Sequence, residues 1–554
     1  MLTSFNLSCI IGGFSRQFVA DRRMMTASSA ALTRPGSNGM RFMASTSKQK
    51  DSSKKTVRRD IAAEVANTFE WLITAFVLAF LFRAFVMEAF RIPTGSMADT
   101  LKGAHFRLRC PQCGCRYDYG FVPERFGLPS DYIPYGGLRG AYDSRCPSCG
   151  YYRPTGGTMP ISNGDRILVL KCIYQFFEPR QWDVVVFKNP LDPRINYIKR
   201  LIGRPGEEVE IIDGDIYING QICRKPPKAQ DELWMPVYDN DYQPVRADEP
   251  RFNGHPWEQP FRNIKGSKWR PDTADHTKFL LESPADKVNT MVYDSSAGND
   301  FRATYAYDEV KDYPYLPFCS DLMVRFYVSR SGGQGQIGIG LSKYGIFYRA
   351  SMDPAGEMVI SRLIDGQESI LARDLAEPTA DGKATLVKFA NVDHRLVFRV
   401  GDKEVIYDMG RRPDDAGVRR ADTKPQAEIF GSGNLTLSHL AVFRDIHYTA
   451  TKYAASTERG RATEGSPLKL EKDEFFVLGD NSPNSEDGRW WGVSGKGNNG
   501  TSYRAGIVPR DYLVGKALFV YWPSGFRPYP TFPFGIIPNV GQMRFIHGGK
   551  DGKP

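Results

Sequence analysis

An apolar stretch from Ile61 to Phe90 constrains this chain most, because such a segment has to be buried in protein or in lipid. Its charge-free part, Trp71–Phe82, is 12 residues long, whereas a helix needs roughly 20 apolar residues to span a bilayer. Apolar residues continue on both sides, and the interrupting Arg83 lies near the end, where its side chain can reach the headgroups. The stretch therefore predicts one transmembrane helix within an anchor at residues 57–90.

Basic residues cluster just before this apolar stretch and carry much of the net charge of +10: Lys48, Lys50, Lys54, Lys55, Arg58 and Arg59. A basic flank is retained in the cytoplasm, so we expect the N-terminus there and the rest of the chain outside the cytoplasm, on a cell membrane. The flank also favours contact with anionic lipid, and no nucleic-acid-binding motif is present. Residues 1–56 form a basic, unstructured segment in this interpretation. For its first part, two interpretations remain open: a transit peptide, or a start codon assigned too early, with later starts at Met24, Met25, Met40 and Met43.

The remainder predicts a mainly β fold, since strand-like runs alternate with turns rich in Gly and Pro. One set of runs forms a compact β core in three pieces: 91–104, 161–227 and 470–545. Two inserts interrupt this core, a small module at 105–160 and a larger one at 228–469, and residues 546–554 form a tail.

The larger insert contains many short strands without helical periodicity, which is typical of a β-sandwich. A hairpin is predicted around Asp393-His394. The stretch Gly333–Gly338 matches GxGxxG, but a strand follows it rather than a helix, so dinucleotide binding is not expected. The whole run resembles concanavalin-like and laminin-G-like sandwiches. That resemblance implies a glycan or a protein as a ligand of the insert.

The smaller insert carries two Cys-Pro-x-Cys knuckles, Cys110/Cys113 and Cys146/Cys149. Each places two thiolates on a tight turn, and four thiolates complete a tetrahedral zinc site of the structural type. We therefore expect a zinc-ribbon-like module. Two local disulfides remain the alternative, because the module is predicted to lie outside the cytoplasm. Cys115 is expected to play no part.

Directly after the anchor, Ser96 lies on a turn formed by Pro93 and Gly95. A serine there can act as a nucleophile if a base takes its proton, but it can equally cap a turn. Two later motifs favour the nucleophile: Tyr197-Ile-Lys-Arg200 and Gly479-Asp-Asn, the latter followed by Ser485-Glu-Asp-Gly-Arg489. With the anchor and the serine motif, in this order, they resemble the bacterial type I signal peptidases. One departure is Ala98-Asp99, where that family usually has a proline.

This resemblance implies a function and a set of roles. Ser96 becomes the nucleophile and Lys199 the general base, while Thr94 completes the oxyanion hole and Ser485 orients the lysine. Asp480, Asp487 and Arg489 become supporting residues. An ordinary lysine near pH 7.4 is unprotonated only about once in a thousand, so Lys199 has to be buried to act as a base.

The resemblance thus implies a serine endopeptidase that needs no cofactor for catalysis and cleaves signal peptides from exported preproteins. The alternative is a membrane-anchored protein that binds a glycan or a partner and carries an inactive peptidase core. A Ser-His-Asp triad is disfavoured, because the histidines lie outside the matching motifs. The large insert is expected to be dispensable for catalysis, since both of its junctions fall between core strands.

Overall fold

The computed structural model describes residues 61–549 apart from 130–131, 135–136, 140–143, 154–157, 250, 253, 333, 379, 411–422, 453–456, 499, 526–534 and 536. The predicted N-terminal segment 1–56 and the end of the tail, 550–554, lie outside the described residues. The chain divides into two units, residues 1–71 and 72–554, and every sheet described below belongs to the second unit.

Helix α2 (Ile61–Leu81) continues into a π-helical turn (Phe82–Val86) and then into strand β1 (Met87–Arg91). Within the described residues, one helical span, Glu64–Val86, is long and apolar enough to cross a membrane; it has 23 residues and a mean hydropathy of 1.9. The apolar part of this span is not buried by the described residues of the protein. The anchor was predicted to reach Phe90, but Met87 onward is strand, because the backbone there pairs with β9, Met87 opposite Leu170.

The core is an antiparallel sheet in the order β1-β9-β35-β10-β11-β31-β34, with β36 beside β35. Its strands, which confirm the expected mainly β fold, are β9 (Arg166–Leu170), β10 (Val184–Lys188), β11 (Asn196–Gly203), β31 (Glu474–Leu478), β34 (Val508–Pro509), β35 (Leu513–Trp522) and β36 (Arg544–Phe545). Val185, Phe187, Leu201 and Val477 fill the centre of this sheet.

A smaller sheet continues the core in the order β14-β13-β12-β30. Its strands are β12 (Glu208–Ile212), β13 (Asp215–Ile218), β14 (Gln221–Ile222) and β30 (Leu468–Lys469). Strand β30 was assigned to the large insert, yet it pairs with β12. Ile446 and Tyr448 also pack with the core cluster rather than with the sandwich. The sandwich therefore ends near Asp445.

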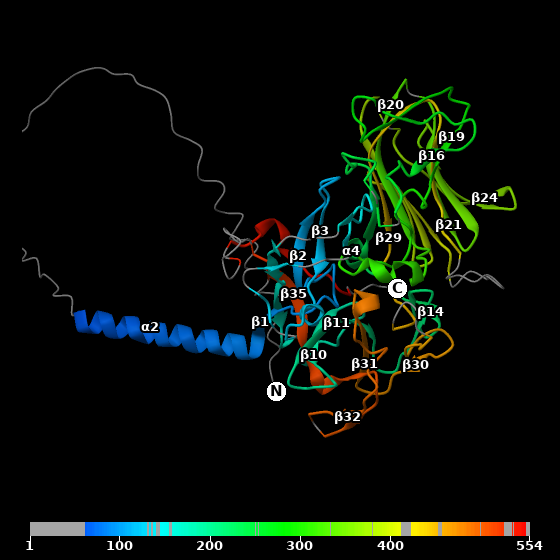
Figure 1. Cartoon of the computed structure of the whole chain (residues 1–554). Coiled ribbons are helices and arrows are strands. Elements are labelled where there is room, and N and C mark those ends of the chain that lie inside the picture. The colour runs from blue at the N-terminus through cyan, green and yellow to red at the C-terminus, as the bar shows by residue number, and fades with distance from the viewer. Residues whose placement is uncertain are drawn as a thin grey trace, which may run out of the picture. The chain divides into compact units, whose positions relative to one another are not determined.

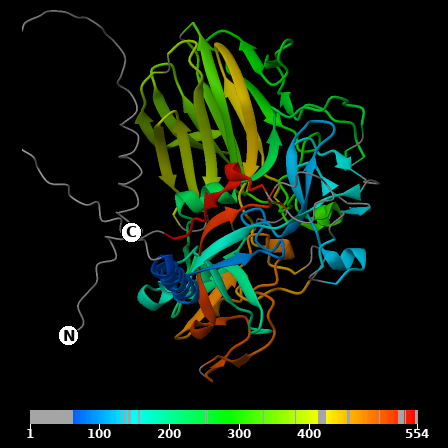
Figure 2. The same ribbon diagram turned by 90° about the vertical axis from the view of Figure 1, so that its left-hand side faces the viewer.

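The large insert folds into two facing sheets, drawn in green to yellow in Figures 1 and 2. One has the order β17-β18-β29-β20-β25-β26-β27 with β15 beside β29, and the other β16-β19-β28-β21-β22-β23-β24. Apolar side chains of both sheets share one cluster that includes Phe326, Ile339 and Phe398, as expected for a sandwich. Asp393 and His394 adopt the positive φ of a tight hairpin turn, as predicted.

The bounds in the first sheet are β15 (Met235–Asp239), β17 (Arg270–Pro271), β18 (Phe279–Glu282), β20 (Leu322–Ser331), β25 (Thr385–Val392), β26 (Arg395–Val400), β27 (Lys403–Asp408) and β29 (Asn434–Arg444). Those in the second are β16 (Phe261–Asn263), β19 (Asn289–Tyr293), β21 (Ile337–Lys343), β22 (Ile346–Met352), β23 (Glu357–Ile364), β24 (Gln367–Leu375) and β28 (Ala427–Gly431). The strand β21 follows the GxGxxG match, in agreement with the rejection of a dinucleotide site.

The cysteine-bearing insert is built on a three-stranded sheet in the order β3-β2-β8, made of β2 (Ala104–Arg109), β3 (Arg116–Gly120) and β8 (Ile161–Asn163). Short ladders complete it: β4 (Leu138–Arg139), β5 (Ser144–Arg145), β6 (Tyr152–Arg153) and β7 (Thr158–Met159). A further ladder pairs β32 (Gly495–Lys496) with β33 (Ser502–Tyr503). The remaining helices are α3 (Ile173–Phe176), α4 (Pro227–Leu233) and the 3₁₀ turns η2 (Pro123–Phe126), η3 (Val310–Tyr315), η5 (Ser482–Asn484), η6 (Arg510–Tyr512) and η7 (Val540–Gln542).

Candidate active site

Ser96 lies in the loop that joins β1 to β2, and this serine loop is held by its own backbone. The amide of Ala98 donates to the carbonyl of Gly95 at 3.0 Å, and that of Leu101 to the carbonyl of Met97 at 2.8 Å. Met97 and Leu101 are fully buried in the core, so the turn is fixed at its far end. Ser96 itself is only 8% exposed.

Lys199 meets Ser96 from strand β11, 103 residues further along the chain. Its Nζ lies 2.5 Å from Ser96 Oγ, within hydrogen-bond distance. Lys199 is 4% exposed, and its Nζ also faces the ring of Tyr197. Burial lowers the pKa of Lys199 to about 8, although the carboxylates of Asp487 and Asp480 act in the opposite direction. Two groups that the sequence places far apart are thus in contact, and the amine is closer to neutrality than a free lysine.

Arg200 follows Lys199 in the strand and contacts different groups, as the alternation of side chains predicts. Its guanidinium donates two bonds to Asp480, at 2.8 and 2.7 Å, and both side chains are fully buried. Asp480 also raises the pKa of Arg200, against the effect of burial, so this pair stays ionised. The supporting role predicted for Asp480 therefore has a partner that was not predicted.

Asp487 and Arg489 form a second buried, two-bond ion pair, at 2.9 and 2.8 Å. Asp487 Oδ2 also accepts from the amide of Gly479 at 3.0 Å. A Cβ on Gly479 would lie 2.1 Å from Ser485 Oγ and 2.5 Å from the carbonyl oxygen of Ser96, so this position requires glycine. The ion pair therefore fixes the backbone against which both serines pack.

Two of the predicted residues lack the contacts expected of them. Ser485 Oγ is buried and has no hydrogen-bond partner among the described residues, so its link to Lys199 stays a prediction. Thr94 is exposed in the turn before Ser96, and its role in an oxyanion hole also stays a prediction.

A group of residues from the large insert also reaches this site and was not predicted. The hydroxyl of Tyr305 donates to the carbonyl of Asp480 at 2.8 Å. Asp308 accepts from Asn481 Nδ2 at 2.9 Å, and the amide of Asn481 donates to the carbonyl of Ser96 at 3.0 Å. The only sequence signal was the alternation of apolar residues between Phe301 and Tyr307, which indicates burial but not the partner.

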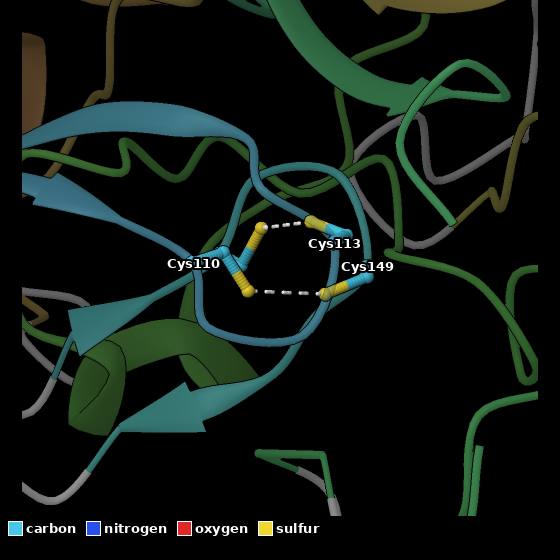
Figure 3. A group of neighbouring side chains, drawn as sticks. Cys110, Cys113 and Cys149 are labelled. Atoms are coloured by element: carbon cyan, nitrogen blue, oxygen red, sulfur yellow. Dashed lines mark hydrogen bonds between the residues drawn. The ribbon is translucent and has the colours of Figure 1, made fainter. Parts of the chain in front are cut away.

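The four predicted cysteines converge on one point, as Figure 3 shows for the three that it labels. The sulfurs of Cys110 and Cys149 are 3.7 Å apart, those of Cys113 and Cys146 are 3.5 Å apart, and all four lie within 4.8 Å of one another. Four sulfurs at about 2.3 Å from a tetrahedral zinc would be separated by about 3.8 Å. The arrangement fits this ion, and Cys115 is not part of the group.

Both knuckles repeat one backbone pattern. Gly114 donates to the carbonyl of Cys110 and Gly150 to that of Cys146, at 2.9 and 3.1 Å, and both glycines have a positive φ. The close sulfur pairs join one knuckle to the other, whereas the disulfide alternative requires pairs within each knuckle.

A second group of possible metal ligands consists of three carboxylates whose oxygens lie within 4.8 Å of one another, those of Asp215, Asp321 and Asp393. Here the ammonium groups of Lys225 and Lys343 already pair with Asp393 and Asp321. These lysines occupy the position that a cation would take. The group is therefore a buried ion-pair network between the core strand β13 and the sandwich.

Comparison with known proteins links the core to one family. A family model described as "Signal peptidase, peptidase S26" matches residues 148–255 and 422–522. The matched ranges contain Lys199, Asp480, Ser485, Asp487 and Arg489, and they leave out Ser96. The gap between them, 256–421, falls within the sandwich.

Individual relatives carry the same name. The chain is 32% identical to "Signal peptidase I" of Rickettsia canadensis and to that of Rickettsia akari, in each case over 152 residues, or 27% of this chain and 42% of the relative. It is 29% identical to that of Rickettsia prowazekii over 168 residues, or 30% of this chain and 46% of the relative. The chain thus spans less than half the length of these relatives.

Among solved structures, the chain is similar to a carbohydrate-binding module, CBM66, from Bacillus subtilis, with 10% identity and a TM-score of 0.22 over 34% of this chain and 99% of that one. It is also similar to sheep galectin-11, with 15% identity and a TM-score of 0.18 over 23% and 92%. TM-scores this low do not support any conclusion about the function of the chain.

Proposed function

We propose that this chain is a membrane-anchored serine endopeptidase that removes N-terminal signal peptides from exported preproteins. The observation that carries the proposal is the 2.5 Å contact between Lys199 Nζ and Ser96 Oγ, in a buried setting that lowers the pKa of the lysine. The similarity of the core to signal peptidases supports the substrate class.

In the proposed reaction, neutral Lys199 takes the proton of Ser96 as Ser96 Oγ attacks the scissile carbonyl carbon. The bond to the leaving amine breaks and Lys199 returns the proton to that amine, which leaves an acyl-enzyme on Ser96. Water then attacks the ester, with Lys199 again as the base, and Ser96 regains its proton. The amide of Ser96 and the hydroxyl of Thr94 would stabilise the oxyanion, where one donor is worth about 2.7–4 kcal/mol.

The proposed topology follows from the helical span Glu64–Val86, which would anchor the enzyme with its N-terminus in the cytoplasm. Strand β1 follows the span directly and leads into the serine loop. The short connection would hold Ser96 near the outer membrane surface, where a signal peptide leaves the bilayer. The four cysteines would bind one zinc ion with a structural role, because four thiolates leave no open position for a substrate.

The test is cleavage of a preprotein by the purified full chain in detergent. Ser96→Ala and Lys199→Ala should each abolish cleavage, because a nucleophile and its base act as a unit. Lys188→Ala is a matched control, since Lys188 lies on the adjacent strand β10 and its ammonium group donates to Asn498 at the surface. Wild-type rates in Lys199→Ala would refute the assignment of the base.

A second proposed activity, ligand binding by the sandwich, is supported by a groove over β20, β25 and β29. Its lining includes Asp241, Arg325, Tyr327 and His439. The ring of Tyr327 is 40% exposed and lies edge-on to His439, whose Nδ1 lies 2.7 Å from Asp241 Oδ2. An exposed aromatic face beside hydrogen-bonding groups suits a sugar ring. Retention on a glycan array that Tyr327→Ala abolishes would support this activity, and no retention would refute it.

A further inference from the structure

One irregular segment of the large insert, residues 299–308, leaves the sandwich and reaches the candidate active site. We call it the strap. It lies between β19 and β20, which belong to different sheets of the sandwich. Its first part stays with the sandwich: Phe301 is in the sandwich core, and the amide of Ala303 donates to the carbonyl of Pro317 at 2.9 Å. The strap thus has a fixed base.

The second part of the strap packs on the serine loop. Tyr305 and Tyr307 form a buried apolar cluster with Ala98, two residues after Ser96. A Cβ on Gly95 would lie 2.2 Å from the ring of Tyr307, so the ring occupies the space beside the residue that precedes Ser96. The hydroxyl of Tyr307 donates to the carbonyl of Ala104 at 2.9 Å, where the serine loop enters β2. One aromatic residue therefore contacts both ends of the loop.

The strap also holds the loop that follows β31. Tyr305 donates to the backbone of Asp480, whose carboxylate binds the neighbour of Lys199, Arg200. Asp308 binds the side chain of Asn481, and the amide of Asn481 binds the carbonyl of Ser96. The nucleophile and the strand that carries its base are thus connected through one segment of the insert.

We propose that the strap is a positioning element of the catalytic site, so that the sandwich is required for efficient catalysis. This proposal rests on the proposed peptidase function and deepens it. It replaces the expectation from the sequence that the insert is dispensable. A shift of about 1 Å in a reacting group can cost about 100-fold in rate, and the strap contacts the backbone on both sides of Ser96.

The first test is kinetic. Tyr305→Phe removes the bond to Asp480 and keeps the ring, and Asp308→Ala removes the bond to Asn481. Each should lower kcat about tenfold and leave KM within about twofold, because neither side chain is placed in contact with the substrate. Asp308→Asn keeps an oxygen acceptor and should recover most of the loss. Tyr293→Phe is the matched control, since it removes the same kind of bond, 2.8 Å to the carbonyl of Asn299, at the base of the strap.

The second test is independent of activity. Amide hydrogen exchange of the peptide 93–101, followed by mass spectrometry, should become faster in Tyr305→Phe and Asp308→Ala and stay unchanged in Tyr293→Phe. Exchange and kcat at the wild-type level in both strap variants would overturn the proposal while leaving the peptidase function in place. A wild-type enzyme that cleaves no preprotein would refute the proposed function, and the exchange rates would still decide whether the strap holds the serine loop.

Discussion

In the proposed reaction, Lys199 is the decisive single residue, because its pKa determines what fraction of the base is neutral. With a pKa of about 8, about a fifth of the lysine is neutral at pH 7.4, compared with about one in a thousand for a free lysine. The cause is local: Lys199 is buried, and the nearby cation Arg489, which also lowers its pKa, is paired with Asp487. Burial therefore outweighs the carboxylates that favour the charged form.

We expect the pH dependence of kcat/KM to report this group. The rate should rise about tenfold per pH unit below pH 8 and level off above it, as the amine loses its proton. Single-turnover cleavage of a preprotein between pH 6 and 10 measures the profile. Asp308→Asn should keep the same midpoint at a lower rate. A rate that does not change between pH 6.5 and 8.5 would contradict a lysine base.

The same burial has a cost in stability. Since the pKa of Lys199 falls from 10.5 in the unfolded chain to about 8 in the folded one, the charged form costs about 3 kcal/mol below pH 8. Between pH 8 and 10.5 the folded chain is neutral at Lys199 and the unfolded chain is still charged, so the cost declines as removal of this proton becomes easier. It vanishes above about pH 10.5, where both states are neutral. Lys199→Met should therefore unfold at a higher temperature than the wild type at pH 7, and the difference should vanish near pH 11. An equal or lower melting temperature at pH 7 would count against a costly buried ammonium.

At the scale of elements, the strands follow from the sequence because alternation and turn residues are local signals. The hairpin predicted around Asp393-His394, for example, forms between β25 and β26. The end of the anchor was misplaced, because Met87–Phe90 is apolar enough for either a helix or a strand and its partner β9 lies about 80 residues later. The contacts of the strap were not predicted for the same reason. The sequence indicates that its apolar residues are buried, whereas the residues they pack against are determined by the tertiary fold.

Part of the candidate site could also be predicted from the sequence, and part could not. The sequence motifs identified Ser96, Lys199 and Asp480 as candidate site residues. That these three residues lie in one site was expected from the family resemblance and not from any local pattern. Arg200 as the partner of Asp480, and Tyr305 and Asp308 as contacts of the loops, come from a different module of the fold. No spacing rule connects modules that meet only after folding.

We predict that the two cysteine knuckles bind one zinc ion, and that this ion keeps the small insert ordered. Protein purified without added metal should contain about one zinc per chain, with four sulfurs at about 2.3 Å by X-ray absorption. Chelation should speed hydrogen exchange over residues 105–125 and 144–152, since the knuckles meet through their sulfurs. Cys115→Ser should leave the zinc content unchanged, whereas Cys149→Ser should lower it. Disulfides at Cys110–Cys113 and Cys146–Cys149 in place of metal would contradict this site.

At the scale of the whole molecule, buried charges join the sandwich to the core, in addition to the apolar contacts of the strap. Lys225, next to the core hairpin β13–β14, pairs with Asp393 and with Asp445 at 2.8 Å. Lys343 of strand β21 pairs with Asp321 and lies 3.8 Å from Asp215 of β13. Charges of this kind fix one docking geometry, because an altered position would leave them buried without partners.

The last prediction concerns the contribution of this ion-pair network to stability and catalysis. Lys343→Met should destabilise the protein by about 3–5 kcal/mol, because Asp321 is left buried with an uncompensated charge. The double variant Lys343→Met/Asp321→Leu should recover much of this loss, since it removes both charges. Thermal unfolding in detergent measures the stability, and preprotein cleavage measures the site. Because the sandwich carries the strap, Lys343→Met should also lower kcat below the melting transition, although it touches no residue of the serine loop. A destabilised variant with an unchanged kcat would mean that the strap keeps its place without the docked sandwich.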